Sequence, residues 1–137
     1  LFMGSYAGQQ AYSSSLVYGV TKAAIHFLTK SLVKEFEPKG ITVNAIAPGF
    51  IQTPWHENRT PESYERINRK IALHRFGEIK DVADMAYSIL TNNYMNGSIV
   101  DIMAGMIISD KVQQKKYHTV SDSCVSCKKY AMKYKHK

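Results

Sequence analysis

The 137-residue sequence lacks any long run of apolar residues. A helix needs about 20 apolar residues to cross a membrane, and the apolar stretches here are short and interrupted by polar side chains. The first residues also lack the basic start and apolar body of a secretory signal. With 45% hydrophobic and 21% charged residues, the composition is typical of one globular domain, and we expect a soluble, cytoplasmic chain without a membrane partner.

Cysteine is scarce as well. The two cysteines, Cys124 and Cys127, form one Cys-Val-Ser-Cys motif, with His118 and His136 nearby. A structural zinc site needs four ligands, and a redox motif of this spacing needs a strand and helix around it. Neither a second cysteine pair nor such a setting is present, so we favour free, reduced thiols over these two alternatives and expect no metal site.

An excess of positive charge is missing from most of the chain. Residues 1–106 carry 10 Lys and Arg against 9 Asp and Glu, a balance of +1, whereas residues 107–137 carry 8 against 2, a balance of +6. The second segment follows neither a helix nor a strand period, so we expect a basic, disordered tail, with a short helix over 128–134 as the alternative. Its mixture of Lys and Tyr is found in some nucleic-acid binders, but a solvated tail is commoner, and we expect no nucleic-acid partner.

The spacing of apolar residues predicts alternating helices and strands. The first long helix has apolar residues at spacings of three and four and is closed by Pro38 and Gly40. Thr60 and Pro61 are a predicted N-cap and first residue of the next helix. Alternation of this kind predicts an α/β fold with a parallel sheet. The predicted helices span residues 16–39, 61–73 and 80–92, and the predicted strands span residues 1–4, 41–47 and 98–103.

Three polar residues near the start of the chain form a candidate catalytic site. Tyr18 and Lys22 are four residues apart, and Ser5 lies thirteen residues before Tyr18. A spacing of four places two side chains on one helix face, about 6 Å apart along the axis. An ammonium group close to a phenol favours the phenolate, which lets a tyrosine serve as acid and base near neutral pH. The alternatives are a packing tyrosine, a solvated lysine and a turn serine.

The second predicted strand ends in a loop that begins with Pro48 and Gly49 and continues through Thr53 and Trp55. Open α/β sheets bind their ligands at the carboxyl ends of the strands. Ser5 would follow the first strand in the same way, so we expect its hydroxyl at this same edge of the sheet. The loop and the three polar residues would then share one site.

These motifs together resemble the short-chain dehydrogenase/reductase family, in particular its branch of 3-oxoacyl-carrier-protein reductases. The resemblance covers residues 1–106 and implies the carboxyl-terminal half of a Rossmann-like domain, with an incomplete parallel sheet. The family's glycine-rich turn has no counterpart in this sequence, so we expect a fragment that is inactive alone and lacks half of the NAD or NADP site. The resemblance rests on Ser5, Tyr18-Gly-Val-Thr-Lys22, Val43-Asn44, Pro48-Gly49 with Thr53, Arg75-Phe-Gly77 and Asn96-Gly97.

The resemblance also implies a role for each site residue. Tyr18 would be the acid/base, Ser5 would orient the substrate oxygen, and Lys22 would support Tyr18 and bind the nicotinamide ribose. Phe50 and Trp55 would cover a small carbonyl or alcohol substrate, although Trp55 can also be interpreted as a hydrophobic anchor of its loop. The implied cofactor-binding residues are Tyr18, Lys22, Pro48, Gly49, Ile51 and Thr53.

The family further implies a homo-oligomer, since the helix that bears the tyrosine and the lysine packs in a subunit interface there. An alternative from another class is a non-catalytic protein. Such a protein would bind a related subunit through its helices, or nucleic acid through its basic tail.

Overall fold

The computed structural model describes residues 1–10 and 15–106, and the predictions made for residues 107–137 lie outside this part of the chain. Three parallel strands form one sheet in the order β1 (Phe2–Met3), β2 (Ala45–Pro48) and β3 (Ile99–Ile102). Phe2 pairs with Ala45, and Ala45 pairs with Ile99. The predicted fold class, a small parallel sheet with three α-helices, is confirmed.

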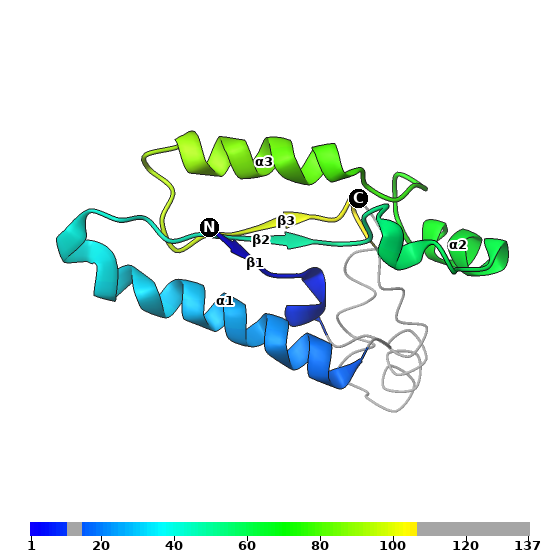
Figure 1. Cartoon of the computed structure of the whole chain (residues 1–137), viewed down its shortest axis with the longest axis horizontal. Helices are drawn as coiled ribbons and strands as arrows, with labels where there is room; N and C mark the ends of the chain where they lie inside the picture. The colour runs from blue at the N-terminus through cyan, green and yellow to red at the C-terminus, as the bar shows by residue number, and fades with distance from the viewer. Residues whose placement is uncertain (11–14, 107–137) are drawn as a thin grey trace, which may run out of the picture. The chain divides into compact units, whose positions relative to one another are not determined.

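The two long helices cover opposite faces of this sheet (Figure 1). Helix α1 (Leu16–Phe36) connects β1 to β2, and helix α3 (Ile79–Thr91) connects β2 to β3. Both connections step across the sheet in the same direction, so helices on opposite faces make the two crossovers opposite in hand. Because parallel crossovers are almost always right-handed, one of the two departs from that rule.

Strand β2 is the centre of the core. Ala45, Ile46 and Ala47 are each 0% exposed, since β2 has a strand on either side and a helix on either face. The predicted strand 41–47 was wrong at its start, because the ladder begins only at Ala45, opposite the first paired residue of each neighbouring strand. The correction matters for the site, because it places Pro48 inside the strand rather than after it.

The turn before β3 is held by two asparagine side chains. The Nδ2 of Asn44 donates to the Met95 carbonyl at 2.8 Å, and its Oδ1 accepts from the Ser98 N–H at 3.0 Å. The Oδ1 of Asn96 accepts from the Val43 N–H at 2.8 Å. Asn44 is only 4% exposed, so its amide is a buried polar group with its partners in place.

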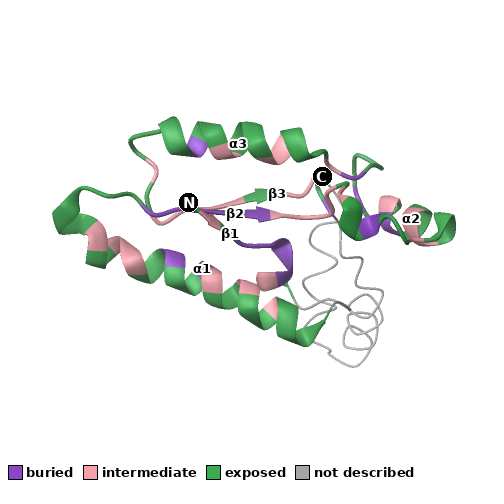
Figure 2. Cartoon of the chain, viewed as in Figure 1, coloured by how far each residue is buried: buried purple, intermediate pink, exposed green. Residues whose placement is uncertain are grey.

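Helix α1 was predicted well in extent, and a 3-10 turn, η2 (Glu37–Lys39), completes the predicted 16–39 segment. The face it turns to the sheet is less apolar than its sequence indicates. Its buried residues are His26 and Thr29, whereas Phe27 is 77% exposed (Figure 2). The Thr29 hydroxyl is satisfied within the helix, donating to the Ile25 carbonyl at 2.8 Å.

Helix α2 (Pro61–Asn68) begins as predicted, with the Thr60 Oγ1 accepting from the Ser63 N–H at 3.3 Å. The predicted end near residue 73 is wrong by about one turn. Ile71 leaves the helix to form an antiparallel bridge with Met106, and both side chains are buried. A contact this distant in sequence is not visible in the local pattern.

Helix α3 and strand β3 match the predicted segments 80–92 and 98–103 closely. The helix starts with a capping box, in which the Asp81 carboxylate accepts from the Glu78 N–H at 2.8 Å. This hydrogen bond, with the nearby Arg75 guanidinium, holds the pKa of Asp81 below its usual value. Within the described residues, no helix combines the length and hydropathy of a membrane span.

Candidate functional site

The carboxyl edge of the sheet collects the residues that the sequence singled out. Strands β1 and β2 are parallel and in register, so Ser5 and Pro48 lie at the same end of neighbouring strands. Helix α1 begins at this edge, with Tyr18 and Lys22 in its first two turns (Figure 1). Because parallel strands all end on one side, the chain brings these positions together although they are spread over 44 residues.

Ser5 follows β1 and is held at two of its polar groups. It is the N-cap of a 3-10 turn, η1 (Tyr6–Gly8), and its Oγ accepts from the Ala7 N–H at 3.2 Å. Its own N–H donates to the Nε2 of His26 at 3.4 Å. Ser5 is 7% exposed, so both bonds lie inside the protein. The hydroxyl still has its proton to donate, since Oγ acts only as an acceptor in the Ala7 contact.

Tyr18 and Lys22 lie on one face of α1, as their spacing predicts. The Lys22 Nζ is 5.6 Å from the centre of the Tyr18 ring. The same ammonium donates to the Met3 carbonyl at 2.9 Å, which links the helix to strand β1. Tyr18 is 42% exposed, so its phenol can reach a ligand from solvent.

Two glycines allow η1 to lie directly on α1. A Cβ at Gly8 would be 2.6 Å from the Lys22 carbonyl carbon and 2.7 Å from the Ala23 nitrogen. A Cβ at Gly19 would be 3.2 Å from the Ala7 oxygen. The turn that carries Ser5 is therefore packed against the backbone of Lys22, and the serine and lysine positions are held in one rigid contact.

The loop after β2 supplies the predicted cofactor-binding positions. The Gly49 N–H donates to the Ile102 carbonyl at 2.9 Å, which extends the pairing with β3 by one residue. Ile51 bridges in parallel to Gly77, where a Cβ would meet the Ile51 side chain at 2.7 Å. Thr53 is half-buried and precedes the 3-10 turn η3 (Pro54–His56), to which its side chain makes no capping bond.

The two residues expected to cover a substrate differ in environment. Phe50 is half-buried and its ring lies 5.5 Å from the ring of Phe76. Trp55 is 85% exposed, so the interpretation of Trp55 as a hydrophobic anchor of its loop is wrong. The buried residue of η3 is His56, whose ring centre lies 5.8 Å from that of Phe50 and 5.3 Å from that of Phe76.

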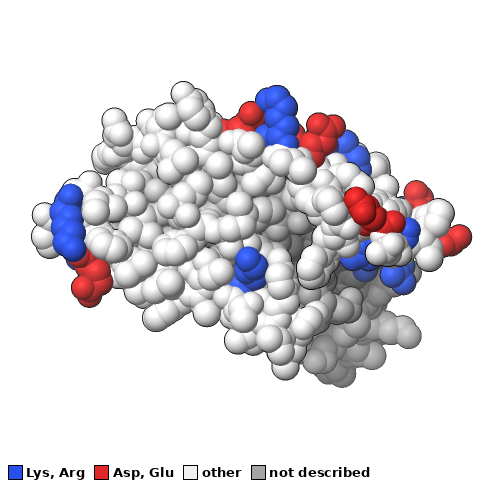
Figure 3. Space-filling model, viewed as in Figure 1, with Lys and Arg blue, Asp and Glu red and all other residues white. Residues whose placement is uncertain are grey.

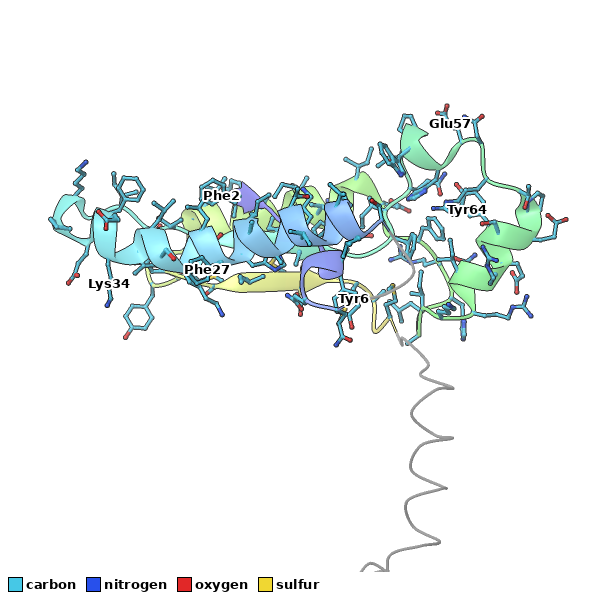
Figure 4. All side chains as sticks on the ribbon, turned by 90° about the horizontal axis from the view of Figure 1, so that it is seen from below. Phe2, Tyr6, Phe27, Lys34, Glu57 and Tyr64 are labelled. Carbon is cyan, nitrogen blue, oxygen red and sulfur yellow. The ribbon has the colours of Figure 1, made fainter. Side chains whose placement is uncertain are left out.

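His56 joins this aromatic cluster through hydrogen bonds as well. Its Nδ1 accepts from the Arg59 Nε at 2.9 Å, and its backbone carbonyl accepts from the Tyr64 hydroxyl at 3.3 Å. Tyr64, labelled in Figure 4, comes from α2. Burial lowers the pKa of His56 from 6.5, and the positive Arg59 lowers it further. A neutral imidazole therefore fits this contact, because Nδ1 must keep its lone pair.

A cavity of about 380 Å³ lies beside this loop but not at the three polar residues. Phe50 and Ile51 line it, together with residues of α3, of β3 and of the 71–77 segment. Ser5, Tyr18 and Lys22 do not line it. The structure thus unites Ser5 with Lys22 through η1, whereas Phe50 and Ile51 border a separate hollow.

The sequence interpretation missed His26, which lies four residues after Lys22 on the same face of α1. It also missed Asp101 of β3, whose Oδ1 accepts from the Gln9 Nε2 at 2.6 Å and so ties the end of η1 to the far strand. The spacing of four between Lys22 and His26 could have predicted that His26 lies on the same face of the helix. Nothing in the local sequence indicates the contact of Asp101, because Gln9 lies 92 positions before it.

Charge on the described part of the molecule is mixed. On the face shown in Figure 3, acidic and basic side chains lie beside one another in small groups. Ion pairs among the described residues include Lys80 with Asp84 at 2.6 Å and Arg75 with Asp81 at 3.3 Å. This arrangement agrees with the near-zero charge balance of residues 1–106.

Comparison with known proteins agrees with this geometry. The family model described as enoyl-(acyl carrier protein) reductase matches residues 1–107. The chain belongs to the short-chain dehydrogenase/reductase family. It is 33% identical over 104 residues to carbonyl reductase family member 4 of Xenopus laevis, and 35% identical over 91 residues to a 3-oxoacyl-(acyl-carrier-protein) reductase of Aquifex aeolicus.

A solved structure shares the fold. A 3-oxoacyl-(acyl-carrier protein) reductase of Brucella melitensis with bound NAD superposes with a TM-score of 0.69 at 32% identity, over 78% of this chain and 40% of that one. The matches cover 76% of this chain and 43% of the Xenopus protein, and 65% of this chain and 37% of the Aquifex protein. The chain thus spans about two-fifths of the length of these relatives.

Proposed function

We propose that this chain carries the proton-transfer half of an NAD(P)-dependent oxidoreductase that interconverts a small carbonyl compound and its alcohol. One observation supports the proposal most directly. The turn that bears Ser5 packs on the backbone of Lys22, one helical turn after Tyr18, at the carboxyl edge of a parallel sheet. In this proposal the hydroxyl and the phenol act on one substrate oxygen, and the ammonium group acts on the phenol.

Each of the three side chains has a distinct task in this proposal. The Ser5 hydroxyl donates its free proton to the substrate oxygen and orients it. Tyr18 passes its proton to that oxygen as the alcohol forms, and takes it back in the reverse direction. The Lys22 ammonium, 5.6 Å from the Tyr18 ring centre, stabilises the phenolate left behind.

The donor set at this edge fits a nicotinamide nucleotide. Lys22 and Tyr18 offer groups that could bond ribose hydroxyls, and Thr53 has a hydroxyl with no capping role. Pro48, Gly49 and Ile51 belong to the end of β2 and the loop after it, where they would contact the bound nucleotide. When bound, the reduced nicotinamide supplies a hydride to the carbonyl carbon. A relative at 32% identity holds NAD. In this proposal Phe50 and Trp55, both from the loop after β2, contact the substrate, and Trp55 has the exposure to do so.

The test measures the reduction of simple ketones with either NADH or NADPH, first by the 137-residue chain and then by a chimaera that carries one of two tyrosine variants. Because the chain spans about two-fifths of its relatives, we expect no turnover until the remaining part of such a fold is supplied. A chimaera in which residues 1–106 replace the matching segment of the Aquifex reductase supplies it.

In that chimaera, Tyr18→Phe should lower the reduction rate by about 10²-fold or more. Tyr87→Phe, on an exposed position of α3, should leave the rate unchanged. An active chimaera that tolerates Tyr18→Phe as well as Tyr87→Phe would contradict the proposed role of Tyr18.

The outer face of α1 also supports a homo-oligomer. Leu16, Val20 and Phe27 are 81%, 59% and 77% exposed, and their spacing places them on one side of the helix; Phe27 is labelled in Figure 4. A row of exposed apolar side chains of this kind is typical of a protein interface. We expect Phe27→Glu to reduce the molar mass of the 137-residue chain's oligomer, as measured by light scattering. Tyr87→Glu on α3 should leave that mass unchanged. Equal masses for wild type and Phe27→Glu would contradict this interface.

A further inference from the structure

His26 occupies a position in α1 where an apolar residue would be ordinary. It is 7% exposed and lies between the helix and the end of β1. Gly4 has no side chain, and a Cβ there would collide with the Nε2 of His26 and lie 3.0 Å from the Ile46 oxygen. The imidazole therefore fills the space that a side chain at position 4 would occupy.

The ring makes its polar contact with the candidate catalytic serine. The Ser5 N–H donates to the His26 Nε2 at 3.4 Å. This hydrogen bond requires a neutral imidazole with its proton on Nδ1, because Nε2 can accept only with its lone pair free. A protonated ring would turn an N–H toward the Ser5 N–H, and the bond would be replaced by repulsion.

The bond to His26 at the Ser5 backbone also bears on the Ser5 hydroxyl, because both groups belong to the same residue. While His26 holds the backbone N–H, the Oγ accepts from the Ala7 N–H at 3.2 Å, which fixes the position of the oxygen atom. His26 and Lys22 both come from α1, the helix that carries Tyr18. The imidazole thus connects the serine to the helix of the other two site residues.

We propose that His26 is a positioning residue, whose neutral ring holds Ser5 in register with Tyr18 and Lys22, and whose protonation releases Ser5. This inference rests on the proposed function, because it takes Ser5 as the residue that orients the substrate.

Burial favours the neutral ring of His26, and the charged groups around it act in both directions. Burial lowers the pKa of His26 from 6.5, and Lys30 and Lys22 on its own helix lower it further. Asp101, from β3, acts in the opposite direction, but its carboxylate is already bonded to the Gln9 amide. Gly4, which follows β1 and leaves the space that the ring fills, carries no side-chain charge.

The test follows the Ser5 amide of the full 137-residue chain by hydrogen exchange in nuclear magnetic resonance. Rates are divided by the random-coil rate at each pH, which removes the intrinsic pH dependence of exchange. We expect protection at about pH 7.5 that falls at least about fivefold as the His26 ring takes up its proton, the ring being followed by its own carbon resonances.

Three variants make the result specific. His26→Gln keeps an acceptor that does not titrate, so Ser5 protection should persist and become independent of pH. His26→Leu removes the acceptor, and protection should be lost at every pH. His74→Asn, at an exposed histidine with a φ of 51° that asparagine tolerates, should behave as wild type.

The proposal is overturned if Ser5 is unprotected in the wild type at about pH 7.5, if its protection does not follow the His26 titration, or if His26→Leu protects Ser5 as the wild type does. None of these readouts involves substrate or nicotinamide, so an inactive chain does not affect them. In an active chimaera, wild-type turnover should also decline as His26 protonates, whereas His26→Gln should not show that decline. A failure of Tyr18→Phe to lower activity would count against the proposed function and leave the Ser5 exchange result unchanged.

Discussion

Replacing Gly8 by alanine tests whether the contact between η1 and α1 assembles the site. The new Cβ would lie 2.6 Å from the Lys22 carbonyl carbon, whereas ordinary contact begins at 3.4 Å, so the two backbones must separate by 3.4 − 2.6 = 0.8 Å. The Lys22 carbonyl carbon belongs to the backbone of α1, which cannot rotate away as a side chain can. Overpacking of this kind costs about 1–3 kcal/mol of unfolding free energy.

Gly19→Ala is the matched control on the other side of the same contact. Its Cβ would be 3.2 Å from the Ala7 oxygen, so a shift of a few tenths of an ångström relieves it. Alanine is also favoured over glycine in a helix by about 1 kcal/mol, which offsets the closer contact. We therefore expect Gly19→Ala to unfold within about 0.5 kcal/mol of the wild type.

Urea unfolding followed by circular dichroism measures both free energies, and the position of the Ser5 amide resonance reports whether η1 has moved. In an active chimaera, a shift near 1 Å should lower turnover by about 10²-fold. If Gly8→Ala unfolded at the wild-type urea concentration with the Ser5 resonance in place, or if Gly19→Ala lost as much stability as Gly8→Ala, the close packing of η1 on Lys22 would not be what positions the serine.

Two further variants test the supports of the sheet and the loop. Asn44→Asp keeps the shape of the side chain but removes the donor to the Met95 carbonyl and buries a carboxyl group. We therefore expect the unfolding free energy measured with urea to fall by about 2 kcal/mol or more. An unchanged urea midpoint would show that the 95–98 turn does not depend on Asn44. The pKa of His56 is below 6.5 in the folded protein, so the unfolded chain binds more protons as the pH falls from about 7 to 5, and the unfolding free energy should fall over that range. His56→Gln should make this fall shallower, and a slope equal to that of the wild type would contradict the assignment.

Much of the fold was predictable because its signals are local. The N-cap Thr60 with Pro61, the periodicity of α3 and the short strand β3 each depend on a few neighbouring residues, and the structure has all of them within about one residue of the predicted start. The early end of α2 was not predictable, since Ile71 leaves the helix for a partner 35 positions away.

The candidate site divides in the same way. A spacing of four on a helix is sufficient to place Tyr18 beside Lys22, and a parallel sheet is sufficient to place Ser5 and Pro48 at one edge. The partners of these residues are tertiary. Neither the Met3 carbonyl that Lys22 bonds nor the imidazole under Ser5 can be inferred without knowing where β1 ends relative to α1.

Those two tertiary contacts explain how a helix with a partly polar inner face keeps its orientation. Lys22 donates to the Met3 carbonyl, and His26, four residues later on α1, accepts from the Ser5 N–H. These two hydrogen bonds hold the residues on either side of Gly4. Apolar packing tolerates rotation and sliding of a helix, whereas two directional bonds to successive peptide groups do not. The rotation of α1 then fixes where the Tyr18 phenol emerges. In the proposed function Lys22 both holds the helix and acts on Tyr18, so a ligand that draws its ammonium away from the Met3 carbonyl would break one of these two bonds and leave the one between His26 and Ser5.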